Sequence, residues 1–141
     1  MKKIITTSFE ETQQLGFDFA KMLKGGAVLA LYGDLGSGKT TFMQGLARGL
    51  GITRNIISPT FLIMRSYEIT KKGLKHLYHL DLYRVEEASK AMDLGINELM
   101  GEPKNIVAIE WPDKIENLLP EKRINIYFAY LGDDKRQIQI S

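Results

Sequence analysis

One stretch of the sequence, residues 33–40, constrains the fold more than any other, because it matches the pattern G-x-x-x-x-G-K-[ST]. In proteins with this pattern, successive backbone N–H groups of a loop surround the phosphates of a nucleotide. Glycine is required at Gly33 and Gly38, where a Cβ would obstruct the close approach of backbone to phosphate. We expect Lys39 to reach the β- and γ-phosphates and the Thr40 hydroxyl to bind Mg²⁺.

The sequence on either side of this loop has the context that the motif requires. Residues 27–32 read as a short, apolar, buried strand, and residues 41–47 begin a helix directly after the loop. This order of strand, loop and helix favours a phosphate-binding loop over the alternative, an ordinary glycine-rich turn. The expected nucleotide contacts in this stretch are Gly33, Asp34, Gly36, Ser37, Gly38, Lys39, Thr40 and Thr41.

The composition limits what else the chain can be. Its 141 residues, 44% of them hydrophobic, suffice for a real core, and we expect a single domain over residues 1–141. With 19 basic and 17 acidic residues, the charge is too balanced for nucleic-acid binding by bulk electrostatics, so any RNA contact is expected to be local or shared with a partner. The absence of cysteine excludes disulfides and thiolate metal sites. No apolar run approaches the length of a membrane span, and a cytoplasmic protein is the default expectation.

Strand and helix signals along the chain predict an α/β fold. Residues 2–7 read as a first strand, and Ser8 with Glu11 forms a capping box at the start of an amphipathic helix. The expected apolar stripe of that helix is Leu15, Phe19, Met22 and Leu23. Shorter helical segments are expected within residues 85–101 and 112–119.

Two pairs of strand-like runs are separated by turn residues and predict antiparallel hairpins. The first pair covers residues 61–69 and 74–83, and the second covers residues 123–131 and 136–140. A hairpin in such a chain means that the sheet is mixed and not a pure set of parallel units. We therefore predict a single-domain P-loop NTPase with a mixed, mostly parallel central sheet, antiparallel hairpins and flanking helices.

The segment that follows the phosphate-loop helix, residues 52–59, lacks periodicity and reads as a surface loop that leads to Thr60. P-loop NTPases often place a threonine in this loop as a switch residue that senses the γ-phosphate and Mg²⁺. The alternative for Thr60 is an ordinary Ser-Pro-Thr turn.

Two carboxylates at strand ends are candidates for a second contact to Mg²⁺, either direct or through water. Asp81 ends one apolar strand, and Glu110 ends a cleaner buried strand at residues 105–109. For each of them the alternative is a solvated strand end, and the sequence does not decide between the two acids. His76 and His79 are interpreted as surface residues of a strand and not as metal ligands, because side chains three residues apart lie on opposite faces of a strand.

Four motifs together resemble the TsaE (YjeE) family, and the resemblance covers essentially the whole chain. These motifs are residues 33–41, 58–61, 79–84 and 110–112. The resemblance implies a bacterial cytoplasmic P-loop ATPase needed for threonylcarbamoylation of the adenosine next to the anticodon in tRNAs that read codons beginning with A. It also implies association with the TsaD and TsaB proteins, TsaD being the protein that carries out the transfer.

Carried over to this chain, the resemblance implies roles for particular residues. Lys39 and Thr40 would serve the phosphates of ATP or ADP and Mg²⁺, and Thr60 would belong to the switch loop. Asp81 and Glu110 would be the site carboxylates, both as Mg²⁺ contacts and as catalytic groups beside Lys39. The four motifs do not mark the residues that contact adenine, for which Thr7, Ser8 and Arg136 are candidates.

Other functions of a phosphate loop are weighed against this one. A small-molecule kinase needs basic residues on a lid, and Arg84 and Lys90 are isolated candidates. A GTPase is disfavoured because the chain has no Asn-Lys-x-Asp or similar guanine-reading sequence. A nucleotide-gated binding module, in which bound ATP or ADP acts as a structural switch, is the alternative from a different class.

Overall fold

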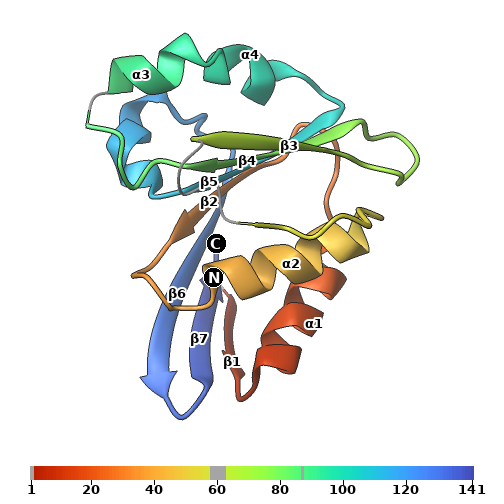
Figure 1. Ribbon diagram of the computed structural model, residues 1–141, viewed down its shortest axis with the longest axis vertical. Helices are drawn as coiled ribbons and strands as arrows, with labels where there is room; N and C mark the ends of the chain where they lie inside the picture. Colours follow the sequence, from red (N-terminus) through yellow and green to blue (C-terminus); the bar gives the residue numbers. More distant parts are fainter. Residues whose placement is uncertain (1, 58–62, 87) are drawn as a thin grey trace.

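Seven strands form one mixed sheet in the computed structural model, which describes residues 2–57, 63–86 and 88–141. Helices α1 and α2 lie on one side of this sheet, and α3 and α4 lie on the other (Figure 1). The elements are β1 Lys2–Thr6, α1 Phe9–Ala20, β2 Val28–Tyr32, α2 Lys39–Gly49, β3 Met64–Glu68, β4 His76–Asp81, α3 Ala88–Asp93, α4 Ile96–Gly101, β5 Asn105–Glu110, the 3₁₀ helix η1 Pro112–Leu118, β6 Ile124–Gly132 and β7 Lys135–Ile140.

The strand order β1-β7-β6-β2-β5-β4-β3 places the parallel strands in the centre. Strands β6, β2, β5 and β4 are parallel neighbours, whereas β3 pairs with β4, β7 with β6, and β1 with β7 in antiparallel fashion. Both predicted hairpins and the mixed α/β fold are thereby confirmed. Because parallel strands end at the same edge of a sheet, the ends of β2, β5 and β4 bring the phosphate loop close to Asp81 and Glu110.

Strand β2 is buried on both faces, which explains its continuous apolar sequence. Leu29 and Leu31 pack into the cluster beneath α1 and α2, whereas Val28 and Ala30 pack into the cluster beneath α3, α4 and η1. None of the helices in the described part of the chain combines the length and apolarity that a membrane span needs.

Helices α1 and α2 pack with their backbones almost in contact. A Cβ added at Gly45 would lie 1.9 Å from the carbonyl oxygen of Gln13, and one added at Gly16 would lie 2.2 Å from that of Phe42. Glycine at these positions therefore permits the close approach of α1 and α2. The tight packing holds α2, whose first residue is Lys39, in place against α1.

The start of α1 follows the predicted cap with one difference. Ser8 Oγ accepts a hydrogen bond from the backbone N–H of Glu11 at 3.1 Å, as expected of an N-cap. The Glu11 carboxylate, however, accepts from the backbone N–H of Thr7 at 2.9 Å, one residue before the cap. The prediction that Met22 lies on the apolar stripe is wrong, because α1 ends at Ala20 and the Met22 side chain is exposed.

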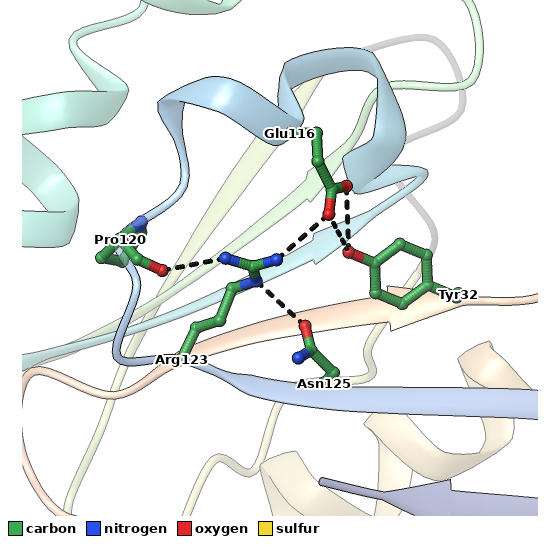
Figure 2. Close-up of polar contacts among 5 residues, drawn as sticks. All are labelled: Tyr32, Glu116, Pro120, Arg123 and Asn125. Carbon is green, nitrogen blue, oxygen red and sulfur yellow. Dashed lines mark hydrogen bonds and ion pairs between the residues drawn. The ribbon is translucent and has the colours of Figure 1, made fainter.

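A polar network joins the end of β2 to η1 and to the start of β6 (Figure 2). The Tyr32 hydroxyl donates to the Glu116 carboxylate at 3.1 Å, and the Arg123 guanidinium donates to Glu116, to Asn125 and to the Pro120 carbonyl. Burial and the bond to Glu116 raise the pKa of Tyr32. Since Tyr32 directly precedes Gly33, this network anchors the strand end from which the phosphate loop begins.

Candidate functional site

The loop between β2 and α2 has the backbone that a phosphate cradle requires. Gly33, Gly36 and Gly38 have φ values of 146°, 79° and 109°, in the region that favours glycine. A Cβ at Gly33 would lie 2.7 Å from the carbonyl oxygen of Phe128. Gly38 is the N-cap of α2 and makes no side-chain cap, so no side chain of its own covers the first N–H groups of the helix. Such a helix start is suited to binding an anion.

Ser37 gives a second indication that the loop fits phosphate. Its side-chain hydroxyl is buried and has no hydrogen-bond partner among the residues that the structure describes. A buried hydroxyl without a partner is costly, and a bound ion or ligand is one kind of partner that satisfies such a group in native proteins. The residues present in the loop therefore fit a phosphate-bearing ligand.

The Lys39 side chain lies across the loop and is almost fully buried. Its ammonium donates to the Gly33 carbonyl oxygen, lies 4.0 Å from Glu110 Oε1 and lies 4.3 Å from the centre of the Trp111 ring. Burial lowers the pKa of Lys39 below its ordinary value, while the carboxylates of Glu110 and Asp81 act in the opposite direction. A phosphate group would add the opposite charge that this buried ammonium favours.

The two candidate carboxylates are brought together, as expected. Asp81 and Glu110 are register partners at the ends of the parallel strands β4 and β5. Glu110 is 3% exposed, whereas Asp81 is half-buried and accepts a hydrogen bond from the backbone N–H of Tyr83 at 3.0 Å. Both acids line one cavity with Thr40, and the choice between them as Mg²⁺ contacts stays open.

The interpretation of His79 as a surface residue is wrong. Its side chain is fully buried, and His79 Nε2 lies 2.6 Å from Glu110 Oε2. The prediction failed because this contact joins residues 31 positions apart and depends on the register of β4 against β5. The sequence signal that could have found it is the spacing of His79 two residues before Asp81, which places both side chains on one face of β4. His76, by contrast, is only partly buried.

The cavity at this edge of the sheet has a volume of about 300 Å³ and joins the loop to both carboxylates. Two arginines, Arg84 and Arg136, line it as well. Arg136 comes from β7, and its side chain passes Gly38 and lies over the Tyr130 ring at 4.4 Å. The lining residues are Leu35, Gly36, Gly38, Lys39, Thr40, Thr41, Asp81, Tyr83, Arg84, Glu110 and Arg136. Thr60, the expected switch residue, lies outside the described residues.

Trp111 directly follows β5 and has a left-handed conformation, with φ 58° and ψ 51°. Such a backbone costs on the order of 1–3 kcal/mol in a residue other than glycine, and it turns the chain sharply into Pro112. The indole contacts the Lys39 ammonium, and the centre of the Tyr83 ring is 5.0 Å from its own. The strained turn therefore places the single tryptophan of the chain against the Lys39 ammonium.

The donor set at this edge suits Mg²⁺ bound jointly with phosphate. In the described ranges, no three histidine, aspartate or glutamate side chains are grouped so as to hold a metal ion by themselves. Mg²⁺ commonly uses one or two protein oxygens and takes its remaining ligands from substrate phosphates and water. Thr40, Asp81 and Glu110 would supply oxygens of that kind.

Comparisons with known proteins place the chain in a family. The family model described as "Threonylcarbamoyl adenosine biosynthesis protein TsaE" matches residues 6–138. TsaE from Bacillus subtilis (strain 168) is 44% identical over 94% of this chain and 80% of its own length, and TsaE from Treponema pallidum is 34% identical over 99% of both. The crystal structure of Bacillus subtilis YdiB superposes with a TM-score of 0.80 at 38% identity, over 99% of this chain and 83% of that one. The chain therefore belongs to the TsaE family of tRNA threonylcarbamoyladenosine biosynthesis proteins.

Proposed function

We propose that this protein binds ATP with Mg²⁺ and hydrolyses it slowly, in support of a TsaD and TsaB complex that threonylcarbamoylates the adenosine next to the anticodon of tRNAs reading codons that begin with A. The observation that carries this proposal is the single cavity in which Lys39, Thr40 and Glu110 meet at the start of α2. The proposed pathway rests on membership of the family. The proposed binding and hydrolysis of ATP rest on the residues that line the cavity.

Phosphate binding would use the backbone of the loop and the Lys39 ammonium. The loop N–H groups would surround the phosphate oxygens, and Lys39 would exchange its contact with the Gly33 carbonyl for a charge-assisted contact to phosphate. Because Lys39 also lies on the Trp111 ring, this exchange would alter the surroundings of the indole. Binding of ATP or ADP would therefore change the fluorescence of Trp111.

Hydrolysis would use the oxygen groups at the same edge. Thr40 and one or both of Asp81 and Glu110 would hold Mg²⁺, which when bound would supply positive charge against the charge that develops on the transferring phosphate. Glu110, which is buried beside the cavity, would also orient the attacking water. These roles belong to turnover more than to nucleotide affinity.

A partner is proposed to complete the site. A phosphate loop alone positions phosphates but supplies little charge at the transferring group, and an added arginine is worth about 10³–10⁵ in rate in other NTPases. Arg84 lines the cavity and could be pressed inward by a partner. Exposed apolar side chains of α3 and of the turn after it, Met92 and Leu94, favour docking of TsaD or TsaB there.

The test is ATP hydrolysis by the protein alone and in mixture with TsaD and TsaB. We expect slow turnover alone, clear acceleration in the mixture, and loss of that acceleration in Arg84→Ala with ATP binding retained. Arg48→Ala, an exposed arginine near the far end of α2, is the matched control and should be accelerated like the wild type. Turnover by the protein alone that equals the mixture would contradict partner completion. Tight ATP binding with no turnover in either setting would favour the nucleotide-gated module instead.

A further inference from the structure

We propose that His79 is a positioning residue for Glu110, holding one carboxylate oxygen so that the other faces Lys39 and the phosphate-binding cavity. The inference deepens the proposed function and rests on it where turnover is concerned. It starts from a fully buried imidazole that contacts the carboxylate at the end of the neighbouring strand.

The register of two parallel strands brings the pair together. Asp81 lies opposite Glu110 and His79 lies opposite Ala108, so His79 is the diagonal neighbour of Glu110 on one face of the sheet. Ala108 is fully buried and has a small side chain. It therefore leaves room for the imidazole to extend past it to Glu110, two residues further along β5. The result is the contact of 2.6 Å between His79 Nε2 and Glu110 Oε2.

The two oxygens of Glu110 have different partners. Oε2 lies against His79, whereas Oε1 lies 4.0 Å from Lys39 Nζ on the side of the cavity. A carboxylate bound through one oxygen cannot rotate freely, so His79 fixes which oxygen is presented to the phosphate side. Polar groups that orient the reactive groups of a site in this way commonly change activity by about 10–100-fold when removed.

The proton of the contact can be assigned from the hydrogen-bond network. His79 Nδ1 is buried and has no partner among the described residues. A proton on Nδ1 would be a buried donor without an acceptor, which is costly, so the network assigns the proton to Nε2. His79 Nε2 then donates to Glu110 Oε2, which leaves Oε1 on the side of Lys39 and the cavity.

A purely structural role for His79 is the competing explanation. Two residues earlier on the same face of β4, Leu77 is fully buried in the apolar core, and a leucine at position 79 would continue that core. Removing only the imidazole leaves the buried Glu110 carboxylate without this partner, which costs stability. A structural role therefore predicts that any loss of activity follows the loss of folded protein, whereas a positioning role predicts that kcat falls in protein that stays folded.

The first measurement uses the protein without nucleotide. Long-range ¹H–¹⁵N NMR spectra should show His79 protonated at Nε2, with that proton shifted strongly downfield by the short contact. In Glu110→Ala this downfield signal should disappear. A proton on Nδ1, or a signal that Glu110→Ala leaves unchanged, would overturn the positioning of Glu110 by His79. This NMR signal does not depend on ATP hydrolysis. A failure of the positioning role can therefore be distinguished from a failure of the proposed ATPase function.

The second measurement compares variants in ATP hydrolysis, ADP affinity and thermal unfolding. His79→Leu should stay folded and keep its ADP affinity within a few-fold, while kcat falls by about 10–100-fold. His79→Gln, whose amide N–H replaces the Nε2 donor, should recover most of that loss. His76→Leu, on the same strand but away from Glu110, should match the wild type. Wild-type kcat in His79→Leu, or a loss that only follows the folded fraction, would overturn the inference.

Discussion

The start of α1 and the carboxyl edge of β4 and β5 are both rich in polar contacts, but they are built differently. At the start of α1, Ser8 Oγ meets an N–H three residues away, and Thr6 meets Thr12 six residues away at 2.7 Å. At the edge of β4 and β5, His79 meets Glu110 across 31 positions. Contacts of the first kind follow from local sequence, whereas those of the second kind need the register of the sheet.

The two regions also differ in how well their polar groups are satisfied. The cap of α1 gives the exposed backbone N–H groups of Thr7 and Glu11 their acceptors. The edge of β4 and β5 instead lies beside a buried ammonium and a left-handed Trp111. Strain and buried charge of this kind are typical of functional sites, whereas satisfied caps contribute stability. Substitutions in the first region should therefore change stability, and those in the second should change turnover.

The largest expected effect is at the edge of the sheet. Glu110→Ala should lower kcat for ATP by about 10²-fold or more, because it removes the group that orients water or holds Mg²⁺. Its ADP affinity should stay within a few-fold, as measured by calorimetry. Glu121→Ala, which removes an exposed acid outside the cavity, is the control for turnover. Normal turnover in Glu110→Ala would move the role to Asp81.

A change between the two helices of the scaffold should act on stability. In Gly45→Ala the new methyl group would meet the Gln13 carbonyl oxygen, and relieving that clash should lower the free energy of unfolding by about 1–3 kcal/mol. Urea denaturation measures the effect. Gly101→Ala provides the comparison, since a Cβ there meets no atom within 4 Å, and it should leave stability unchanged or slightly higher. Equal stabilities for the two variants would argue against close packing of α1 on α2.

A smaller loss is expected at the helix cap. Ser8→Ala removes the acceptor of the Glu11 N–H and should lower the free energy of unfolding by about 1 kcal/mol. Ser8→Thr keeps a hydroxyl at the cap and should retain most of the stability in the same denaturation experiment. If both substitutions cost the same, the cap contact does not stabilise α1.

The smallest expected effect is a pH dependence at the same cap. Hydrogen bonds from the Thr7 backbone N–H and hydroxyl lower the pKa of Glu11. A carboxylate with a lowered folded-state pKa stabilises the fold fully above its unfolded-state pKa and loses this contribution as pH falls through the folded-state value. The difference in Tm between the wild type and Glu11→Gln should therefore be present near neutral pH and vanish in acid. A difference that is constant with pH would show that the charge of Glu11 plays no part.

The features that the sequence predicts again depend mainly on local contacts, whereas most of those that it misses depend on the register of the sheet. The cap at Ser8, both hairpins and the meeting of Lys39 with Asp81 and Glu110 follow from short motifs and from the rule that parallel strands end at one edge. The prediction for Met22 is wrong because α1 ends at Ala20, although the helical spacing of apolar residues in the sequence continues beyond that residue. His79 and Arg136 reach the site through strand pairing, which the local sequence alone does not specify, although the two-residue spacing of His79 and Asp81 places both on one face of β4. The switch role of Thr60 stays a prediction.

Calorimetric titration of ATP into the wild type and Lys39→Ala tests the central claim most directly. The contact of the Lys39 ammonium with phosphate should contribute about 1.5–3 kcal/mol, so Lys39→Ala should bind ATP about tenfold more weakly or worse. The wild type should also bind ATP more tightly than GTP. Undiminished ATP affinity in Lys39→Ala, or equal affinities of the wild type for ATP and GTP, would contradict an ATP site built on residues 33–40.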